Sequence, residues 1–276
     1  MSDGKVIIDT ELDSKGAEKG ISNLSKSLGG IGKVGSVALK GTAVAIGAAT
    51  TAIGGLVVAS TKAYASYEQL VGGVDTLFKD ASGQVQKYAA DAYKTAQLSS
   101  NQYMEQITGF SASLVQSLEG DTEKAAQYGN RAIIDMADNA NKMGTGIEMI
   151  QNAYQGFAKQ NYTMLDNLKL GYGGTKTEME RLISDASQMT DIQNKLNVSV
   201  NEGDLSFGNI VNAISVMQDS LGIAGTTATE ASTTIEGSAN TMKASWQNPV
   251  TGMGSDNANL DELITQFVNS VTTFAG

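Results

Sequence analysis

The sequence predicts an all-α protein, and three observations support that fold class. The chain of 276 residues has a single proline, Pro249, so nearly all of it lacks the residue that most strongly interrupts helices. Aromatic residues make up only 6% of the chain, whereas Ala, Gly, Ser and Thr are abundant. A core of small side chains suits closely packed helices. Apolar residues also recur at helical spacing between capping signals, so we expect multiple amphipathic helices.

Residues 1–13 are the exception, because they predict a short N-terminal strand or arm. Within KVIIDTELD, alternate residues lie on one side of an extended chain: Val6, Ile8, Thr10 and Leu12. A helix capped by Asp13 or Ser14 is expected to follow. A single strand needs a partner, so this arm would pair with another chain or another protein, or stay disordered.

Residues 14–62 predict a long cationic helix with a heptad repeat. Its a and d positions are apolar at first and then small, and they form a self-association seam: Ile21, Leu24, Leu28, Ile31, Ala38, Ala45, Ala49, Ala52 and Leu56. Lysines recur every seven residues at position f, the position farthest from the seam: Lys19, Lys26, Lys33 and Lys40. We expect this segment to associate with itself in parallel, as a trimer.

The end of this segment, Gly41–Ser60, holds twenty residues without a charge. As a helix it would be about 30 Å long, enough to span the hydrocarbon core of a bilayer. Its few Val, Ile and Leu residues make insertion marginal. Small residues four apart, Gly47, Thr51 and Gly55, are typical of close helix pairs in membranes. A buried helical seam in a soluble bundle is the alternative.

Residues 63–248 predict a series of capped amphipathic helices. The expected helix starts are Ser82, Ser99, Asp121, Thr145, Thr175, Ser206 and Thr227. Three of them form capping boxes, in which Thr145 pairs with Glu148, Thr175 with Glu178 and Thr227 with Glu230. The expected stops are Gly120, Gly144, Gly171–Gly174, Gly222 and Pro249. Residues 249–276 predict a last helix near Asn259 to Phe274 without a terminal cap, as expected for a chain cut from a longer protein.

Composition limits the chemistry. The chain has no cysteine and no histidine, so it lacks disulfides, thiolate sites, the usual general base and the commonest zinc ligand. The net charge is −10, which opposes specific binding to nucleic acid. Residues 1–62 carry a net charge of +2, and Lys19–Lys62 contains no acidic residue at all. We expect no catalytic site, no cofactor and no metal.

Local motifs agree with that expectation. GYGGTKT, residues 171–177, lacks glycine at the positions that a phosphate loop needs, and it predicts a glycine turn before a helix capped by Thr175. DMADNANKMGTGIE and DNANLDE resemble calcium loops in composition but put Ile150 and Val268 at the final ligand position. Asp135 and Asp138 lie one helical turn apart, and their polar neighbours predict an exposed helix face.

The run AIIDMADNANKMGTGIEMIQNAYQGFAKQNYTMLDNLKLGYGGTKTEMERLI resembles the core region of phage tail tape measure proteins from siphophages and prophages of Gram-positive bacteria. YEQLVGGVDTLFKDASGQVQKYAADAYKTA and TTIEGSANTMKASWQN are similar to flanking parts of that region, and KVIIDTELD resembles the usual N-terminus. The resemblance covers nearly the whole chain. One departure is Pro249, where relatives tend to carry leucine in a continuing helix.

The resemblance implies a structural protein inside the lumen of the tail tube, which sets tail length as a ruler and later assists genome ejection. It implies the tail tube protein, tail assembly chaperones and distal tail or baseplate proteins as partners. The host cytoplasm would be its location during assembly, and the host membrane a target after ejection. As one helix, 276 residues would mark at most about 410 Å. The alternative function is a bacterial pore-forming or membrane-associated helical protein.

Overall fold

The computed structural model describes residues 22–23, 52–255 and 258–275, and every regular element in these ranges is a helix. The all-α fold class is therefore confirmed for the described part of the chain. The elements are α3 (Ala52–Phe78), η1 (Lys79–Ala81), α4 (Ser82–Thr95), α5 (Ser100–Ser117), α6 (Thr122–Met143), α7 (Ile147–Phe157), η2 (Leu165–Leu168), α8 (Lys176–Ser187), α9 (Thr190–Leu196), α10 (Phe207–Ser220), α11 (Thr226–Thr233), α12 (Ile235–Met253) and α13 (Leu260–Ala275).

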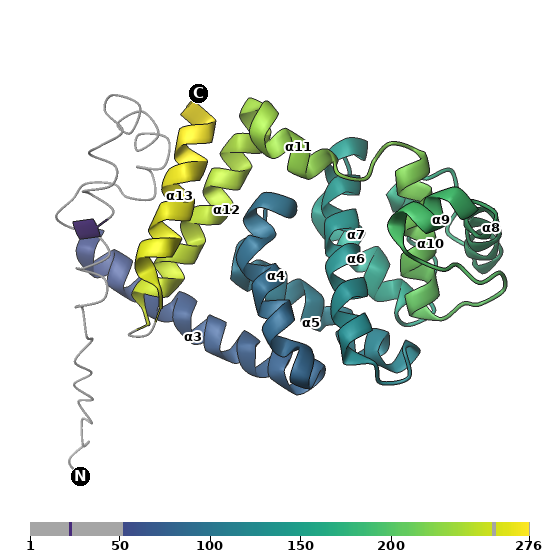
Figure 1. Cartoon of the computed structure of the whole chain (residues 1–276), viewed down its shortest axis with the longest axis horizontal. Coiled ribbons are helices and arrows are strands. Elements are labelled where there is room, and N and C mark those ends of the chain that lie inside the picture. Colours follow the sequence, from purple (N-terminus) through teal and green to yellow (C-terminus); the bar gives the residue numbers. More distant parts are fainter. Residues whose placement is uncertain (1–21, 24–51, 256–257, 276) are drawn as a thin grey trace, which may run out of the picture.

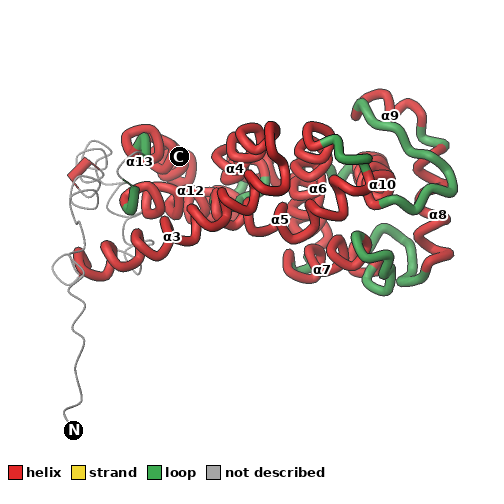
Figure 2. Tube along the Cα trace, turned by 90° about the horizontal axis from the view of Figure 1, so that it is seen from below, coloured by secondary structure: helices red, strands yellow, loops and turns green. Residues whose placement is uncertain are grey.

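The helices fold back on one another instead of forming one rod. Figure 1 shows α3 along one edge of the molecule, and α8, α9 and α10 at the end opposite α12 and α13. Helix α12 packs against α3, and α13 packs against α12. Helices α4, α5 and α6 lie between these ends and pack against each other. Figure 2 shows that the longer loops gather around α8 and α9.

Two hydrophobic clusters hold the described helices together. The larger one extends from α3 to α10, and its largest fully buried side chains include Phe78, Tyr103 and Tyr154. The smaller one lies between α12 and α13 around Phe267, where the ring of Trp246 lies 5.0 Å from that of Phe267, centroid to centroid. Many core positions are alanine, as the composition predicts for closely packed helices.

Several predicted helix starts are confirmed by their hydrogen bonds. The side chain of Asp121 accepts from the backbone N–H of Lys124, and that of Thr175 accepts from the N–H of Glu178. Ser99 caps α5 through a full capping box with Gln102, which the sequence analysis did not identify as a box. Gly144, with φ of 64°, ends α6 in the left-handed conformation that glycine adopts most easily.

Two predicted capping boxes are wrong. The hydroxyl of Thr145 donates to the carbonyl of Asn167 at 3.1 Å, and α7 begins two residues later, after Gly146. Thr227 lies inside α11, whose N-cap is Gly225. At Thr145 the hydroxyl that would cap the helix bonds to Asn167 instead, and at Thr227 the backbone N–H that Glu230 would accept from donates to Asp138.

The predicted stop at Pro249 is also wrong, because α12 continues to Met253 with the proline inside it. An interior proline removes its own N–H from the helix ladder and crowds the carbonyl four residues earlier, and packing of α12 against α3 and α13 supports the helix here. The boundary drawn between residues 248 and 249 therefore falls inside a helix. The boundary at residue 62 likewise falls inside α3. The last predicted helix is confirmed as α13.

The predicted strand over residues 1–13 and most of the heptad helix lie outside the described residues. Of the uncharged segment Gly41–Ser60, only Ala52–Ser60 is described, at the start of α3. Among the described helices, none combines the length and the hydropathy that a membrane span requires.

Candidate functional site

Most site residues expected from the sequence cannot be placed. The following seam and small residues lie outside the described residues: Ile21, Leu24, Leu28, Ile31, Ala38, Ala45, Ala49, Gly47 and Thr51. Ala52, Gly55 and Leu56 lie in the first two turns of α3. The self-association seam and the membrane segment therefore stay predictions, and the described helices bring together other groups.

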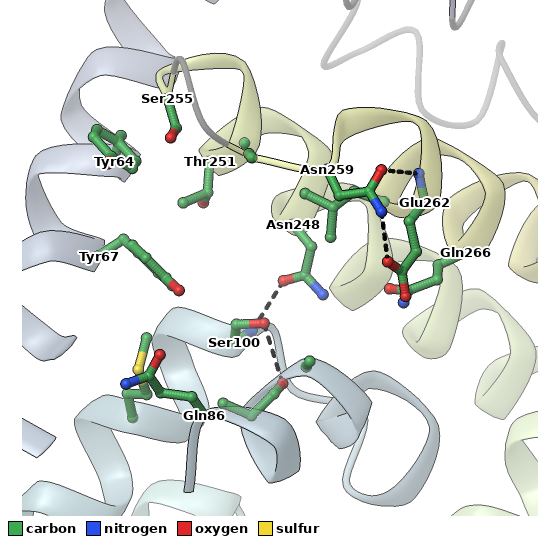
Figure 3. A pocket seen from close by; sticks show the side chains of 16 residues that line it. Tyr64, Tyr67, Gln86, Ser100, Asn248, Thr251, Ser255, Asn259, Glu262 and Gln266 are labelled. Carbon is green, nitrogen blue, oxygen red and sulfur yellow. Dashed lines mark hydrogen bonds between the residues drawn. The ribbon is translucent and has the colours of Figure 1, made fainter. Parts of the chain in front are cut away.

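A cavity of about 410 Å³ lies where α3, α4 and α5 meet α12 and α13. Figure 3 shows Tyr64 and Tyr67 of α3 on one side, and Asn259, Glu262 and Gln266 at the start of α13 on the other. The two tyrosine rings stack with centroids 6.0 Å apart and an interplanar angle of 18°. The cavity thus has an aromatic wall facing a polar and acidic wall.

Close helix approach at two glycines shapes this cavity. A Cβ atom on Gly254 would lie 2.6 Å from the carbonyl oxygen of Ser60, so α12 ends directly against the backbone of α3. A Cβ atom on Gly252 would lie 2.6 Å from a methyl group of Leu263 on α13. At Gly254 the close atom is backbone, so a larger residue there would push α12 away from α3, whereas at Gly252 the side chain of Leu263 would have to move.

Polar side chains connect the helices around the cavity. The carboxamide oxygen of Asn248 accepts from the backbone N–H of Ser100 at 2.9 Å, which satisfies one of the free N–H groups in the first turn of α5. The carboxamide nitrogen of Asn101 donates to the carbonyl of Ala63 at 2.9 Å. These contacts fix α12 to α5 and α5 to α3, and so hold the cavity walls in place.

The polar wall has unused hydrogen-bonding capacity. Asn248 is only 5% exposed, yet its Nδ2 has no partner among the described protein atoms. The buried Oε1 of Gln266 also lacks a partner. Because an unpaired buried polar atom is costly, these groups require water or an incoming polar group. The site can bind a polar or cationic group, since it combines a free donor, a free acceptor and the carboxylate of Glu262.

A second polar cluster lies at the centre of α6, where the sequence analysis predicted an exposed face. That prediction is wrong: Asp135 is 5% exposed and Asp138 is 0% exposed. The hydroxyl of Ser215 on α10 donates to the carboxylate of Asp135. Burial raises the pKa of Asp135 to about 7, although the Ser215 hydrogen bond lowers that pKa, and the nearby charge of Asp138 adds to the rise.

Asp138 acts as a cap for a different helix. Its carboxylate accepts from the backbone N–H of Gly225 at 2.6 Å and from that of Thr227 at 2.8 Å, at the start of α11. Burial raises the pKa of Asp138, and these two hydrogen bonds partly offset the rise. Since the carboxylates of Asp135 and Asp138 both bond to neighbouring helices, they tie α6 to α10 and α11.

Sequence reasoning could have found part of this arrangement. Ala132 and Asn139 lie one helical turn away from Asp135 and are both buried, so a carboxylate on that stripe is shielded from solvent. The partners are far away in sequence, at Ser215 and Gly225, and no local motif points to them. Among the described residues, no cluster of three or more potential metal ligands occurs.

Comparisons with protein-family models, with curated proteins and with solved structures find no match to this chain.

Proposed function

We propose that this chain acts as a phage tail tape measure protein, a structural protein that occupies the lumen of the tail tube. In this proposal it scaffolds tube assembly, contributes to tail length and assists genome ejection. The observation that carries the proposal is the sequence resemblance, which is strongest over residues 132–183. Tail tube protein, assembly chaperones, distal tail proteins and other copies of the chain are the proposed partners.

The fold supports a structural role for residues 132–183. They form most of α6, all of α7 and η2, and most of α8. Some of their polar side chains bond within this stretch: Asn139 donates to the carbonyl of Leu168 at 2.9 Å, and the hydroxyl of Thr145 donates to the carbonyl of Asn167 at 3.1 Å. The residues that carry the resemblance thus maintain one defined shape.

The fold also changes how the proposed ruler would work. A length of about 410 Å requires one continuous helix. The longest described helix, α3, has 27 residues and spans about 40 Å at that rise. We therefore propose that residues 52–275 serve as a folded assembly unit, and that length is measured by helices that remain extended within the tail.

Charge supports passage of DNA past this unit. Residues 63–276 carry a net charge of −12. Affinity for the phosphate backbone comes from clustered Lys and Arg, so an acidic surface in the lumen would not retain DNA.

Tail morphology tests the proposal in the phage or prophage that encodes the chain. An early stop codon should abolish tails of defined length, whereas a synonymous change at the same codon should leave them normal. Deleting about 60 residues from an extended helix of the same gene product should shorten tails by roughly 90 Å. Replacing those residues with an unrelated helical sequence of equal length should restore the length.

Two results would reject this function. Tails of normal length without the chain would show that it is not the tape measure. Recovery of the chain in membranes, with dye leakage and no association with tails, would favour the alternative of a membrane-active helical protein.

A further inference from the structure

The cavity between α3, α4, α5, α12 and α13 has the size and lining of a small-molecule site. Its volume is about 410 Å³, whereas a cavity of about 150 Å³ already accommodates benzene. Apolar side chains cover part of its wall, among them Ala89, Ala90 and Met104. A few polar groups interrupt this apolar lining, as is typical of sites that orient a small organic ligand. The proposed tail function makes no use of this cavity.

Asn248 supplies the best defined polar group of the cavity. Its Oδ1 accepts from the backbone N–H of Ser100 at 2.9 Å, and only the oxygen of a carboxamide can accept. This bond fixes the orientation of the carboxamide, so the atom left over is the donor Nδ2. Asn248 is 5% exposed, and Nδ2 has no acceptor among the described protein atoms. An oxygen of a ligand, from a hydroxyl or a carbonyl group, would satisfy this donor.

Helix α13 places two acceptors on the other side of the cavity. The buried Oε1 of Gln266 has no donor within the described part of the chain. Glu262 is exposed and accepts from the carboxamide of Asn259 at 2.9 Å, but it forms no salt bridge with any described residue. Figure 3 shows Glu262 next to Gln266. Among the described residues that line the cavity, none is lysine or arginine, so a cationic donor has to come from a ligand.

The aromatic side of the cavity adds a further polar group. Tyr64 and Tyr67 stack with their ring centroids 6.0 Å apart, and both side chains are partly buried. Figure 3 shows the hydroxyl of Tyr67 directed into the cavity, towards Ser100. A hydroxyl group both donates and accepts, so it can bond to a hydroxyl or to an amine. The cavity therefore presents polar groups on facing walls, which suits a ligand with several hydroxyl groups.

We propose that this cavity binds an amino sugar, a ring that carries several hydroxyl groups and one ammonium group. The ammonium group bonds to the carboxylate of Glu262. Hydroxyl groups of the sugar accept from Nδ2 of Asn248 and donate to Oε1 of Gln266, while the carbon skeleton lies against the apolar part of the wall. This inference does not depend on the proposed tail function.

Simpler ligands leave part of the wall without a partner. A neutral sugar offers no cation to Glu262. An amine without hydroxyl groups offers no acceptor to Asn248, whose buried donor then stays unpaired at a cost to binding. An anionic ligand is repelled by Glu262, and no lining residue provides a compensating positive charge. The combination of ammonium and hydroxyl groups is what satisfies both walls.

Titration of the full chain with glucosamine tests the class of ligand, with NMR of the side-chain carboxamides as the measurement. At about pH 6 the amine is protonated, and saturable binding with a millimolar Kd is expected for a molecule this small. Glucose keeps the hydroxyl groups without the charge, and cyclohexylamine keeps a ring and the charge without the hydroxyl groups. Each should bind at least about fivefold more weakly. Equal affinity of either compound, or no saturable binding of glucosamine, would overturn the proposal.

Variants of the full chain test where the ligand binds. Glu262→Gln keeps the shape of the side chain and removes its charge, so glucosamine should bind about fivefold more weakly, whereas the affinity for glucose should stay the same. The matched control Asp261→Asn removes the same charge from the same turn of α13, at a residue that does not line the cavity. It should change the affinity for glucosamine by less than about twofold, because exposed charges that do not touch the ligand are screened.

A third variant fills the cavity without changing its polar groups. Ala90→Leu adds three carbon atoms at a helical position in the cavity wall, and it should abolish the binding of glucosamine. Circular dichroism shows whether each variant keeps its helices, and Glu262→Gln, at an exposed position, should keep them all. An unchanged affinity for glucosamine in either Glu262→Gln or Ala90→Leu would refute this site.

Discussion

The buried carboxylate of Asp135 predicts an unusual dependence of stability on pH. Its pKa is raised from 3.8 to about 7 in the folded protein, chiefly by burial. Between these two values the folded protein binds a proton that the unfolded chain has lost, so stability decreases as the pH rises through this range. At 1.36 kcal/mol for each pKa unit, the free energy of unfolding should fall by about 4 kcal/mol from about pH 4 to above pH 7.

The replacement Asp135→Asn tests this prediction with a side chain of nearly the same shape. The neutral carboxamide can still bond to the hydroxyl of Ser215, but it carries no charge at any pH. Urea unfolding should therefore show that the variant is more stable than the parent at about pH 8 and similar to it at about pH 4. The matched control Asp191→Asn, at an exposed position, should change stability by less than about 0.5 kcal/mol throughout.

Other charged side chains near Asp135 also affect how stability depends on pH. Asp138 has a pKa raised in the same direction, so part of the pH dependence should remain in the Asp135→Asn variant. The positive charge of Arg131 lowers the pKa of Asp135, whereas the negative charge of Asp219 raises it. A variant whose stability relative to the parent is the same at both pH values would refute the assignment of a raised pKa to Asp135.

Three further predictions concern the packing of α11 and the N-terminal segment. Asp138→Ala leaves the buried N–H of Thr227 and the partly buried N–H of Gly225, at the start of α11, without their acceptor. It should therefore cost about 2–4 kcal/mol in urea unfolding; a loss below about 0.5 kcal/mol would contradict the capping role. Sedimentation of the full chain should show a trimer that Leu24→Ser with Leu28→Ser dissociates, and a strict monomer at high concentration would exclude the seam. The free protein should float with liposomes and release their dye. The variant Ala52→Lys should do neither, because a charge in the middle of the inserted segment costs about 2.5–3.5 kcal/mol. Identical behaviour of the two proteins would exclude a membrane role for the segment.

The sequence by itself determined the features that depend on neighbouring residues. The all-α class followed from one proline, small side chains and helical periodicity, and these act locally. The N-caps at Asp121 and Thr175 could be predicted because each bonds to a backbone group three residues away. The resemblance to tape measure proteins is likewise a property of the sequence, and the described structure leaves it a proposal.

The tertiary structure decided which polar groups are buried and which residues meet. Asp135 and Asp138 are buried because α10 and α11 cover α6, and their partners lie 80 to 89 residues further along the chain. The cavity takes its walls from five helices, so no single stretch of sequence contains its pattern. Pro249 stays helical because contacts with α3 and α13 outweigh its local preference. Burial depends on contacts between distant segments, and a local pattern carries no information about which segments will meet.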